Sequence, residues 1–493
     1  MTEVKAPSGH DALGQKTISF FGSCVLTVNN VAGPGMLGIP LVFQQAGWLV
    51  PILILCTIYI VSSFASTMIC ETMNLVPGNS HYQERLEFST VIKHYFGVKA
   101  YYVCQLFYNL SLTTMNIASI LVSAQVMDEF IVFCFGQSYA IQFFPRFDIV
   151  VADASQAIPF EYAGSVILSL GYVTTLTMCM PMGFLNLDEN IIFQYLSFAI
   201  LVGFMGEFFW QFFSNTLHFD QVPFVGKDQS QSLGVIIFAF TYVVTVPSWC
   251  NEKMESVSVN KVIWFSALGS TAAYVLFGLA GAWAYPNMTS ANILTVMGAP
   301  NQPVITQVSV YIFSVGVIAL GIPLFSIFIR YNLFVGGVCG SKMSAFWGAV
   351  FPWLVGFLLY QGQGFTLFVN WSALIVNGFI NFVVPGIVYI KAKHEVRRLR
   401  KEQGQEEEED DEERALLISA KSDGMLQQLV AINDDADRSG GGYRRHQVIP
   451  VSVPQPYKRY LEIYFPWAMT VFITILILYT IALNIYLAAT GQQ

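Results

Sequence analysis

Long apolar segments alternate with short polar intervals along most of this chain. The apolar segments cover residues 17–43, 46–75, 100–130, 163–182, 188–213, 232–250, 262–285, 303–331, 345–361, 364–390 and 459–488. An α-helix needs about 20 predominantly apolar residues to cross a bilayer, and these segments have roughly that length. The pattern therefore predicts an all-α polytopic membrane protein with about 11 transmembrane helices.

The polar intervals divide the chain into four parts. Residues 1–16 are a polar N-terminus, 17–390 a core of ten helices, and 459–493 an eleventh helix with a short C-terminus. Residues 391–458 lack the apolar side chains that a core needs, so we expect a disordered loop. In this loop, Leu416 and Leu417 follow acidic residues, as in a dileucine signal for a sorting adaptor, although short patterns also arise by chance.

Basic residues predict the orientation of the spans. If the N-terminus is cytoplasmic, the cytoplasmic segments hold Lys5, Lys16, Arg85, Lys93, Lys99, Lys253, Lys261, Arg330 and Lys342. The external segments then hold only Arg146 and Lys227, as the positive-inside rule requires. We expect a cytoplasmic N-terminus in the plasma membrane or a vacuolar or endolysosomal membrane, with lipid around the bundle.

Composition adds little to this picture. The chain is 54% hydrophobic and 11% charged, whereas a soluble protein is about 25% charged. Much of its net charge of −8 comes from the acidic run 406–413, which lies outside the membrane segments, so this charge indicates nothing about a substrate. None of the eight cysteines shows the CxxC spacing of a metal site.

The first apolar segment contains a sequence that breaks helices, VNNVAGPGMLGIP. Pro34 removes a backbone donor, and Gly33 and Gly35 permit dihedral angles that other residues avoid. Irregular backbone at membrane depth is tolerated only where it is buried in protein or lines a wet cavity. We therefore expect the amides of Ala32–Gly35 to bind a carboxylate, and the carbonyls of Val28 and Val31 to face a coupling cation.

A second interruption lies in the sixth segment, where Pro247 follows the run Val243–Val246. Interruptions in corresponding segments of two halves indicate a transporter built from inverted repeats, here about 17–213 and 232–390. We expect the substrate pocket to include Phe240, Thr241, Tyr242 and Val243, with carbonyls of this break binding an ammonium group. This apolar, partly aromatic lining favours a neutral amino acid.

Four stretches carry a family resemblance. They are AGPGMLGIP in the first segment, FAF…VP-W-NEK in the sixth, IPLF…R at the end of the eighth and NFVVPGIVYI at the end of the tenth. In this order and spacing they resemble the amino acid/auxin permease family of the amino acid–polyamine–organocation superfamily. The resemblance implies a leucine-transporter-type fold of five plus five helices with one peripheral helix. It also implies proton- or sodium-coupled transport of amino acids.

The eighth segment departs from the family pattern. Members often carry Ser-x-Pro there, and this chain has Gly321 in the serine position although it keeps Pro323. Hydroxyl groups of this segment help to bind sodium in the sodium-coupled relatives. The departure therefore favours a proton as the coupling ion, with sodium as the alternative and Ser314 and Ser326 as candidate replacement hydroxyls.

Other polar residues inside the spans are candidates for the site. Glu207 is the only acid well inside an apolar stretch, so it is a candidate proton carrier, with an interfacial position as the alternative. Asn29 and Asn30 adjoin the first break and either contact substrate or ion, or cap freed backbone groups. Asn377 and Asn381 share one helix face, at the site or between helices.

These observations predict a secondary transporter that moves neutral amino acids by alternating access. We expect no cofactor and no enzymatic activity, because the chain shows no nucleophile–base set and no metal-ligand spacing. One alternative is an amino-acid sensor that binds its ligand and signals through the loop 391–458. A channel is the other, but the sequence shows no ring of charges for a pore.

Overall fold

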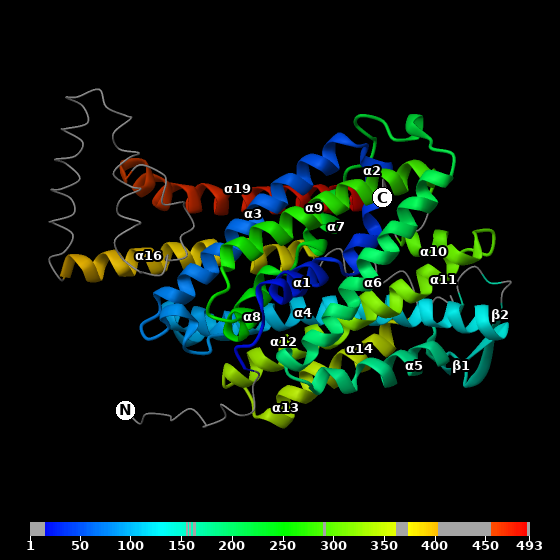
Figure 1. The fold of residues 1–493 in the computed structure, drawn as a ribbon, viewed down its shortest axis with the longest axis horizontal. Coiled ribbons are helices and arrows are strands. Elements are labelled where there is room, and N and C mark those ends of the chain that lie inside the picture. The colour runs from blue at the N-terminus through cyan, green and yellow to red at the C-terminus, as the bar shows by residue number, and fades with distance from the viewer. Residues whose placement is uncertain are drawn as a thin grey trace.

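The structure is a computed structural model that describes residues 15–153, 156, 159–160, 164–288, 292–360, 373–402 and 455–490. Its helices run back and forth along one direction and form a single bundle, with a small sheet at one end (Figure 1). The predicted disordered loop 391–458 begins too early, because residues 391–402 continue a helix, and residues 403–454, with Leu416 and Leu417, lie outside the described residues.

The first half of the chain supplies the following elements: α1 (Phe20–Val31), η2 (Pro34–Gly38), α2 (Ile39–Ala46), α3 (Leu49–Leu75), η3 (Ser80–Tyr82), α4 (Phe88–Phe135), β1 (Gln137–Phe144), β2 (Asp148–Asp153), β3 (Val166–Ser169), α5 (Leu170–Cys179), η4 (Pro181–Phe184), α6 (Leu187–Ser214) and η5 (Phe219–Gln221). A residue with a positive φ, Gly97, separates the first two turns of α4 from its long membrane part.

The second half supplies α7 (Ser232–Ala239), η6 (Val243–Thr245), α8 (Val246–Glu252), α9 (Val259–Ala284), α10 (Ile293–Met297), α11 (Val304–Phe313), η7 (Ser314–Ala319), α12 (Leu320–Val335), α13 (Ser341–Ala345), η8 (Phe346–Val350), α14 (Phe351–Leu359), η9 (Ala373–Asn377), η10 (Phe379–Val383), α16 (Val384–Glu402) and α19 (Gln455–Thr490).

Among the described residues, nine helices are long and apolar enough to cross a membrane, and the bent pair α1 and α2 makes a tenth. The segment predicted as a helix over 163–182 is shorter than expected. Helix α5 begins only at Leu170, because Val166–Ser169 pair with β1 as a strand. The bundle is thus helical with one exception, a small sheet that the apolar pattern did not predict.

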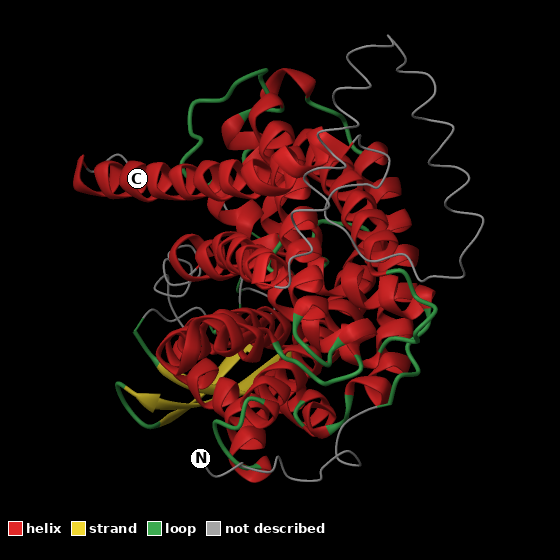
Figure 2. Ribbon diagram, turned by 90° about the vertical axis from the view of Figure 1, so that its left-hand side faces the viewer, coloured by secondary structure: helices red, strands yellow, loops and turns green. Residues whose placement is uncertain are grey.

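The two ends of the bundle differ in structure. We call the end where α1, α4, α6 and α9 begin the N-terminal face, and the opposite end, where β1–β3 lie, the sheet face (Figure 1). The sheet has the strand order β2-β1-β3 and is antiparallel throughout. Figure 2, viewed from the N-terminal face, shows the helices packed around the centre and the strands at one edge of the bundle.

Candidate functional site

The first predicted break is present in the structure. Helix α1 ends at Val31, and the chain continues after Gly33 as η2 and α2, with a bend of 48° between the two halves. The Ala32 N–H donates to the Val28 carbonyl and the Gly33 N–H to the Val31 carbonyl, each at 2.7 Å. Within the described residues, the Gly35 N–H has no hydrogen-bond partner. It is the one bare amide of the predicted anion site in this state.

The carbonyl of Val31 is also occupied in this state. The Tyr274 hydroxyl of α9 donates to it at 2.5 Å. The ring of Tyr274 packs edge-on against Phe240 of the second break, with 5.7 Å between the ring centroids. Tyr274 therefore connects the two breaks, and an ion at Val28 and Val31 would bind carbonyls that already accept hydrogen bonds.

The second predicted break separates α7 from α8. Helix α7 ends at Ala239, and the Thr241 hydroxyl donates back to the Ile237 carbonyl at 3.0 Å. The Val244 N–H at the start of the next half-helix donates to Asn381 Oδ1 at 3.2 Å. Asn381 of the tenth span thus caps the second half-helix of the sixth span. This contact places Asn381 beside the second break.

The two breaks lie directly against each other. A Cβ atom added to Gly35 would lie 2.7 Å from the Cα of Ala239, so only glycine fits at this crossing. Beside it, Asn30 Nδ2 donates to the Thr245 hydroxyl at 2.5 Å. At Gly33, by contrast, an added Cβ would meet only the Asn30 carbonyl, at 3.9 Å. Free space therefore adjoins Gly33, whereas Gly35 is packed against backbone.

Asn29 makes contacts on the other side of the first span. Its Nδ2 donates to the backbone carbonyl of Gln194 at 2.8 Å and to the side-chain Oε1 of Gln194 at 3.0 Å. Gln194 Nε2 in turn donates to the Leu320 carbonyl at 3.1 Å and to Asn190 at 2.8 Å. A chain of neutral amides thus joins the first, fifth and eighth spans next to Gly321. Neither Asn29 nor Asn30 caps freed backbone of the first break through these bonds.

The residues of both breaks are closed off from solvent. Phe240, Thr241, Tyr242 and Val243 are each at most 1% exposed. Asn29 and Asn30 are also buried, and in the described part of the chain each keeps an Oδ1 atom without a hydrogen-bond partner. The Tyr242 hydroxyl faces Ser62, Ser63 and Ser66 of α3. A ligand reaches these groups only after the helices move.

Two predicted residues lie apart from the breaks. Glu207 in α6 accepts from the Thr306 hydroxyl of α11 at 2.8 Å through Oε1, while its Oε2 is buried without a partner. Ser314 begins η7, and its buried hydroxyl has no partner among the described residues either. Neither hydrogen-bonds to the residues of the breaks, so the structure does not bring them into one cluster with Asn29 and Asn30.

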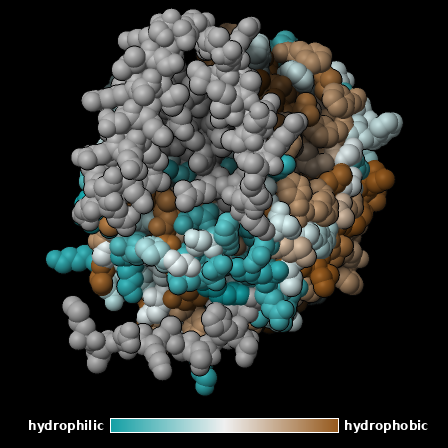
Figure 3. All heavy atoms as spheres, turned by 60° about the vertical axis from the view of Figure 1, so that its left-hand side comes forward, coloured by the Kyte–Doolittle hydropathy of each residue, from teal (hydrophilic) through white to brown (hydrophobic). Residues whose placement is uncertain are grey.

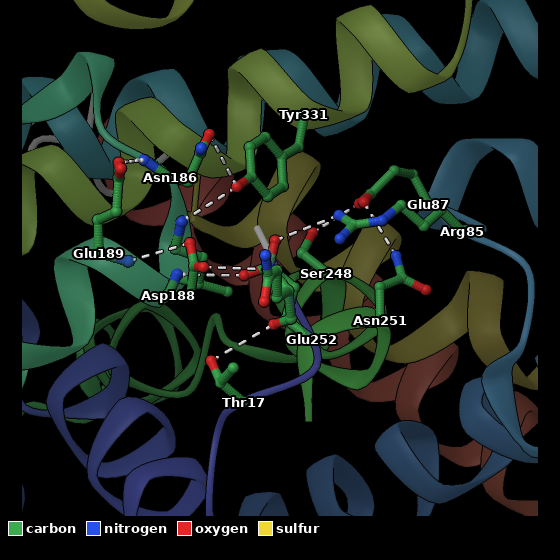
Figure 4. A network of polar contacts seen from close by, with 12 residues as sticks. Thr17, Arg85, Glu87, Asn186, Asp188, Glu189, Ser248, Asn251, Glu252 and Tyr331 are labelled. Carbon is green, nitrogen blue, oxygen red and sulfur yellow. Dashed lines mark hydrogen bonds and ion pairs between the residues drawn. The ribbon is translucent and has the colours of Figure 1, made fainter. Parts of the chain in front are cut away.

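A polar network joins the elements at the N-terminal face (Figure 4). Arg85 pairs with Glu252 at the end of α8 at 3.3 Å, and Glu252 also accepts from the Asp188 N–H at 3.1 Å. The segment before α1 is included, because the Ile18 N–H donates to the Glu252 carbonyl at 3.1 Å. Figure 3 shows hydrophilic residues gathered over this face beside a hydrophobic flank. The network holds the half-helix α8 in place.

Glu87 belongs to the same network and is buried. Its carboxylate oxygens accept from the Ser248 hydroxyl at 2.6 Å and from Asn251 Nδ2 at 3.1 Å, both in α8. Burial raises the pKa of Glu87 to about 7, although these two hydrogen bonds and Arg85 oppose the rise. A carboxyl group that titrates near neutral pH thus contacts the second half of the broken sixth span.

Three residues at the breaks were not expected from the sequence: Gln194, Thr245 and Tyr274. Each is a polar residue inside an apolar span, which is a weak signal, since such residues also join helices without a functional role. Among the described residues, no group of His, Cys, Asp or Glu side chains has the geometry of a metal site.

Comparison with known proteins agrees with this architecture. The family model described as transmembrane amino acid transporter protein matches residues 16–334. No curated protein matches the chain. Mhp1, a nucleobase-cation-symport-1 family transporter, in a closed conformation with bromovinylhydantoin bound, is 13% identical, with 78% of this chain and 80% of that one covered and a TM-score of 0.53. The inward-facing conformation of Mhp1 is 11% identical, with 79% and 81% covered and a TM-score of 0.54.

At these identities the structural likeness shows the fold alone, and it confirms the predicted leucine-transporter-type arrangement. A manganese transporter of Eremococcus coleocola is also similar, at 12% identity and a TM-score of 0.45, with 97% of this chain and 98% of that one covered. The family model covers well over half of the chain, including both breaks. The chain belongs to the family of transmembrane amino acid transporter proteins.

Proposed function

We propose that this protein is a secondary transporter that moves neutral amino acids by alternating access. One observation carries the proposal: two broken spans meet backbone to backbone at Gly35 and Ala239, so that half-helix ends lie side by side in the bundle. The positive end of a half-helix binds a carboxylate, and carbonyls of unwound backbone bind a cationic group. A zwitterion presents both groups on neighbouring atoms.

The polar contacts at the breaks support a neutral side chain on the substrate. Asn30, Thr245, Tyr274 and Asn381 provide the side-chain contacts between the breaks, and all are uncharged. A charged substrate side chain buried there would lack an opposite charge, which is costly in a water-excluding site. Phe240 and Val243 supply an apolar surface instead.

We further propose that the coupling ion is a proton. Gly321 has no hydroxyl, and the amide of Gln194 already binds the carbonyl of the neighbouring Leu320. The buried Oε2 of Glu207 has no donor, and a proton on it removes the cost of an unpaired carboxylate oxygen. Glu207 is therefore our candidate proton carrier.

The distribution of basic residues supports a cytoplasmic N-terminal face. Arg85 and Lys253 lie at this face, and closure of the Arg85–Glu252 network would shut the cytoplasmic path. In the proposed cycle, this network opens to release substrate and closes again before the next substrate enters from the sheet face. The burial of both breaks supports the interpretation of the present state as closed.

Uptake of labelled amino acids into proteoliposomes tests the proposal. A panel of acidic, basic and neutral amino acids is offered under imposed pH and sodium gradients. We expect neutral amino acids to accumulate with a pH gradient alone. Binding without net uptake would instead indicate a sensor, and a requirement for sodium would refute proton coupling.

The variant Glu207→Gln separates substrate binding from coupling. It keeps the hydrogen bond from Thr306 but cannot exchange a proton near neutral pH. We expect exchange of substrate across the membrane to persist, while accumulation driven by a pH gradient falls at least tenfold. Unchanged accumulation would exclude Glu207 as the proton carrier.

A further inference from the structure

The strands β1 and β2 form a hairpin that carries apolar side chains on both of its faces. On the inward face, Ala140 and Ala152 are each at most 2% exposed and pack with Phe160, which lies beyond β2. Large apolar side chains on the other face are unusual in water, since an antiparallel pair with one buried face normally carries polar residues on the other. The outward face therefore needs its own explanation.

The outward face of this hairpin is exposed and continuous. Tyr139 is paired with Val151, and Ile141 with Ile149, so these four side chains point to the same side of the sheet. Their exposed fractions run from 39% for Ile141 to 66% for Ile149. At the turn, Phe147 is 76% exposed. Such a patch of large apolar side chains marks a surface that contacts protein or membrane.

The position of the hairpin favours membrane. The ring of Phe143 packs edge-on against Phe357 of α14, with 5.7 Å between the centroids. On the same helix, Leu354 is 53% and Leu358 is 62% exposed, as expected of a helix surface that faces lipid. The apolar patch is thus continuous with the lipid-facing side of the bundle, and the strands lie at its edge rather than over its centre (Figure 2).

The hairpin is firmly attached to the membrane helices. Asp128 of α4 accepts from the Ser138 hydroxyl of β1 at 2.9 Å, from the Gly171 N–H of α5 at 2.8 Å and from the Tyr360 hydroxyl at 2.6 Å. One buried carboxylate therefore holds the sheet, α4, α5 and the end of α14 together. The sheet keeps a constant depth relative to the bundle.

We propose that the β1–β2 hairpin lies in the headgroup region of the leaflet at the sheet face and inserts its aromatic surface into lipid. Aromatic side chains concentrate at this depth, and Arg146 at the turn reaches the phosphates. Among the described strands, none pairs with the outer edge of β2, and unpaired backbone groups are not tolerated within hydrocarbon. The hairpin therefore lies at the interface rather than across the membrane core.

An environment-sensitive fluorophore at the turn tests this proposal. In the full-length protein, the exposed cysteines Cys56 and Cys134 are replaced by serine, and NBD is attached at Phe147→Cys. In phosphatidylcholine vesicles we expect blue-shifted emission that is quenched severalfold more by lipids with a nitroxide near the headgroup than by aqueous iodide. A matched label at Lys227→Cys, in another loop of the sheet face, should show the opposite preference.

A second label at Ile149→Cys tests the outward face itself, because Ile149 is paired with Ile141 on that face. Strong iodide quenching at both positions would overturn the proposal. Protection that appears only at high protein-to-lipid ratio, without quenching by the lipid nitroxide, would assign the surface to a second copy of the chain and also overturn it. The readout does not depend on transport, so its failure leaves the proposed function untouched.

Discussion

The two helix breaks reach similar geometry by different means. The first contains Gly33, Pro34 and Gly35, which interrupt a helix in any context. The second has neither glycine nor proline between Phe240 and Val246, where β-branched residues predominate, and Pro247 follows only in the first turn of α8. Its unwound backbone is held by neighbours: Asn381 caps the Val244 amide and Asn30 binds Thr245. The first break is thus encoded by glycine and proline within it, whereas the second, which Pro247 marks in the sequence, is held mainly by tertiary contacts.

The difference predicts where each break is vulnerable. A substitution within the first break should reduce transport only where a small residue allows close packing, as at Gly35. The second break should fail when a distant partner is removed. The following predictions test this distinction, from the largest expected effect to the smallest.

Gly35→Leu should cause the largest loss. Its side chain would overlap the backbone of Ala239, and overpacking of this kind costs about 1–3 kcal/mol or more. We expect the initial rate of uptake in proteoliposomes, normalised to inserted protein, to fall at least 100-fold. Wild-type uptake in this variant would mean that the two breaks do not pack together as described.

Asn381→Ala should have the next largest effect, because it leaves the buried Val244 N–H without an acceptor. An unpaired buried donor costs about 1–3 kcal/mol, which corresponds to a loss of roughly 5- to 100-fold in the population of the correct state. Uptake and thermal stability are measured together. The control is Asn377→Ala on the same helix, since the Asn377 side chain makes no hydrogen bond among the described residues. Equal losses in both variants would contradict a specific cap.

Glu87 should make the N-terminal face sensitive to pH. Burial raises its pKa from 4.5 to about 7, so a bound proton stabilises the closed arrangement. This stabilisation is complete below pH 4.5 and is lost as the pH rises to about 7. The face should therefore open more often at pH 8 than at pH 5.5, and Glu87→Gln should abolish the dependence.

The labelling rate of the buried Cys250 in α8 by a thiol reagent measures this opening. Dividing the labelling rate of the wild type by that of Glu87→Gln at each pH removes the effect of the titration of the Cys250 thiol, which is the same in both proteins. We expect this ratio to rise severalfold between pH 5.5 and pH 8. A constant ratio would show that Glu87 does not control opening.

Gly33→Ala should have the smallest effect. Its φ of −86° suits alanine, and its Cβ would meet only the Asn30 carbonyl at 3.9 Å. A glycine replaced in a compatible conformation changes stability by about 0.4–1 kcal/mol at most, in the favourable direction. We expect unchanged or slightly raised thermal stability and a KM altered by a few fold if substrate occupies the adjoining space. A loss of uptake as large as that of Gly35→Leu would show that the two glycines do not differ in their packing.

Much of the architecture was predictable from the sequence. Length and apolarity revealed the membrane spans, because the bilayer sets both requirements, and the Gly-Pro-Gly stretch located the first break. The sheet was not predicted, since β3 merges with the apolar run that becomes α5. The start of that helix at Leu170 depends on pairing of Val166–Ser169 with β1, a partner more than 20 residues away.

The site was only partly predictable for a related reason. By itself, the sequence determined the membrane class, the spans and the places of the two interruptions, all of which follow from local composition and backbone chemistry. Tertiary structure alone decided that Gly35 lies on Ala239, that Asn29 reaches Gln194 and that Tyr274 joins both breaks. These contacts join residues that are distant along the chain, and no local pattern specifies which buried polar group will meet which.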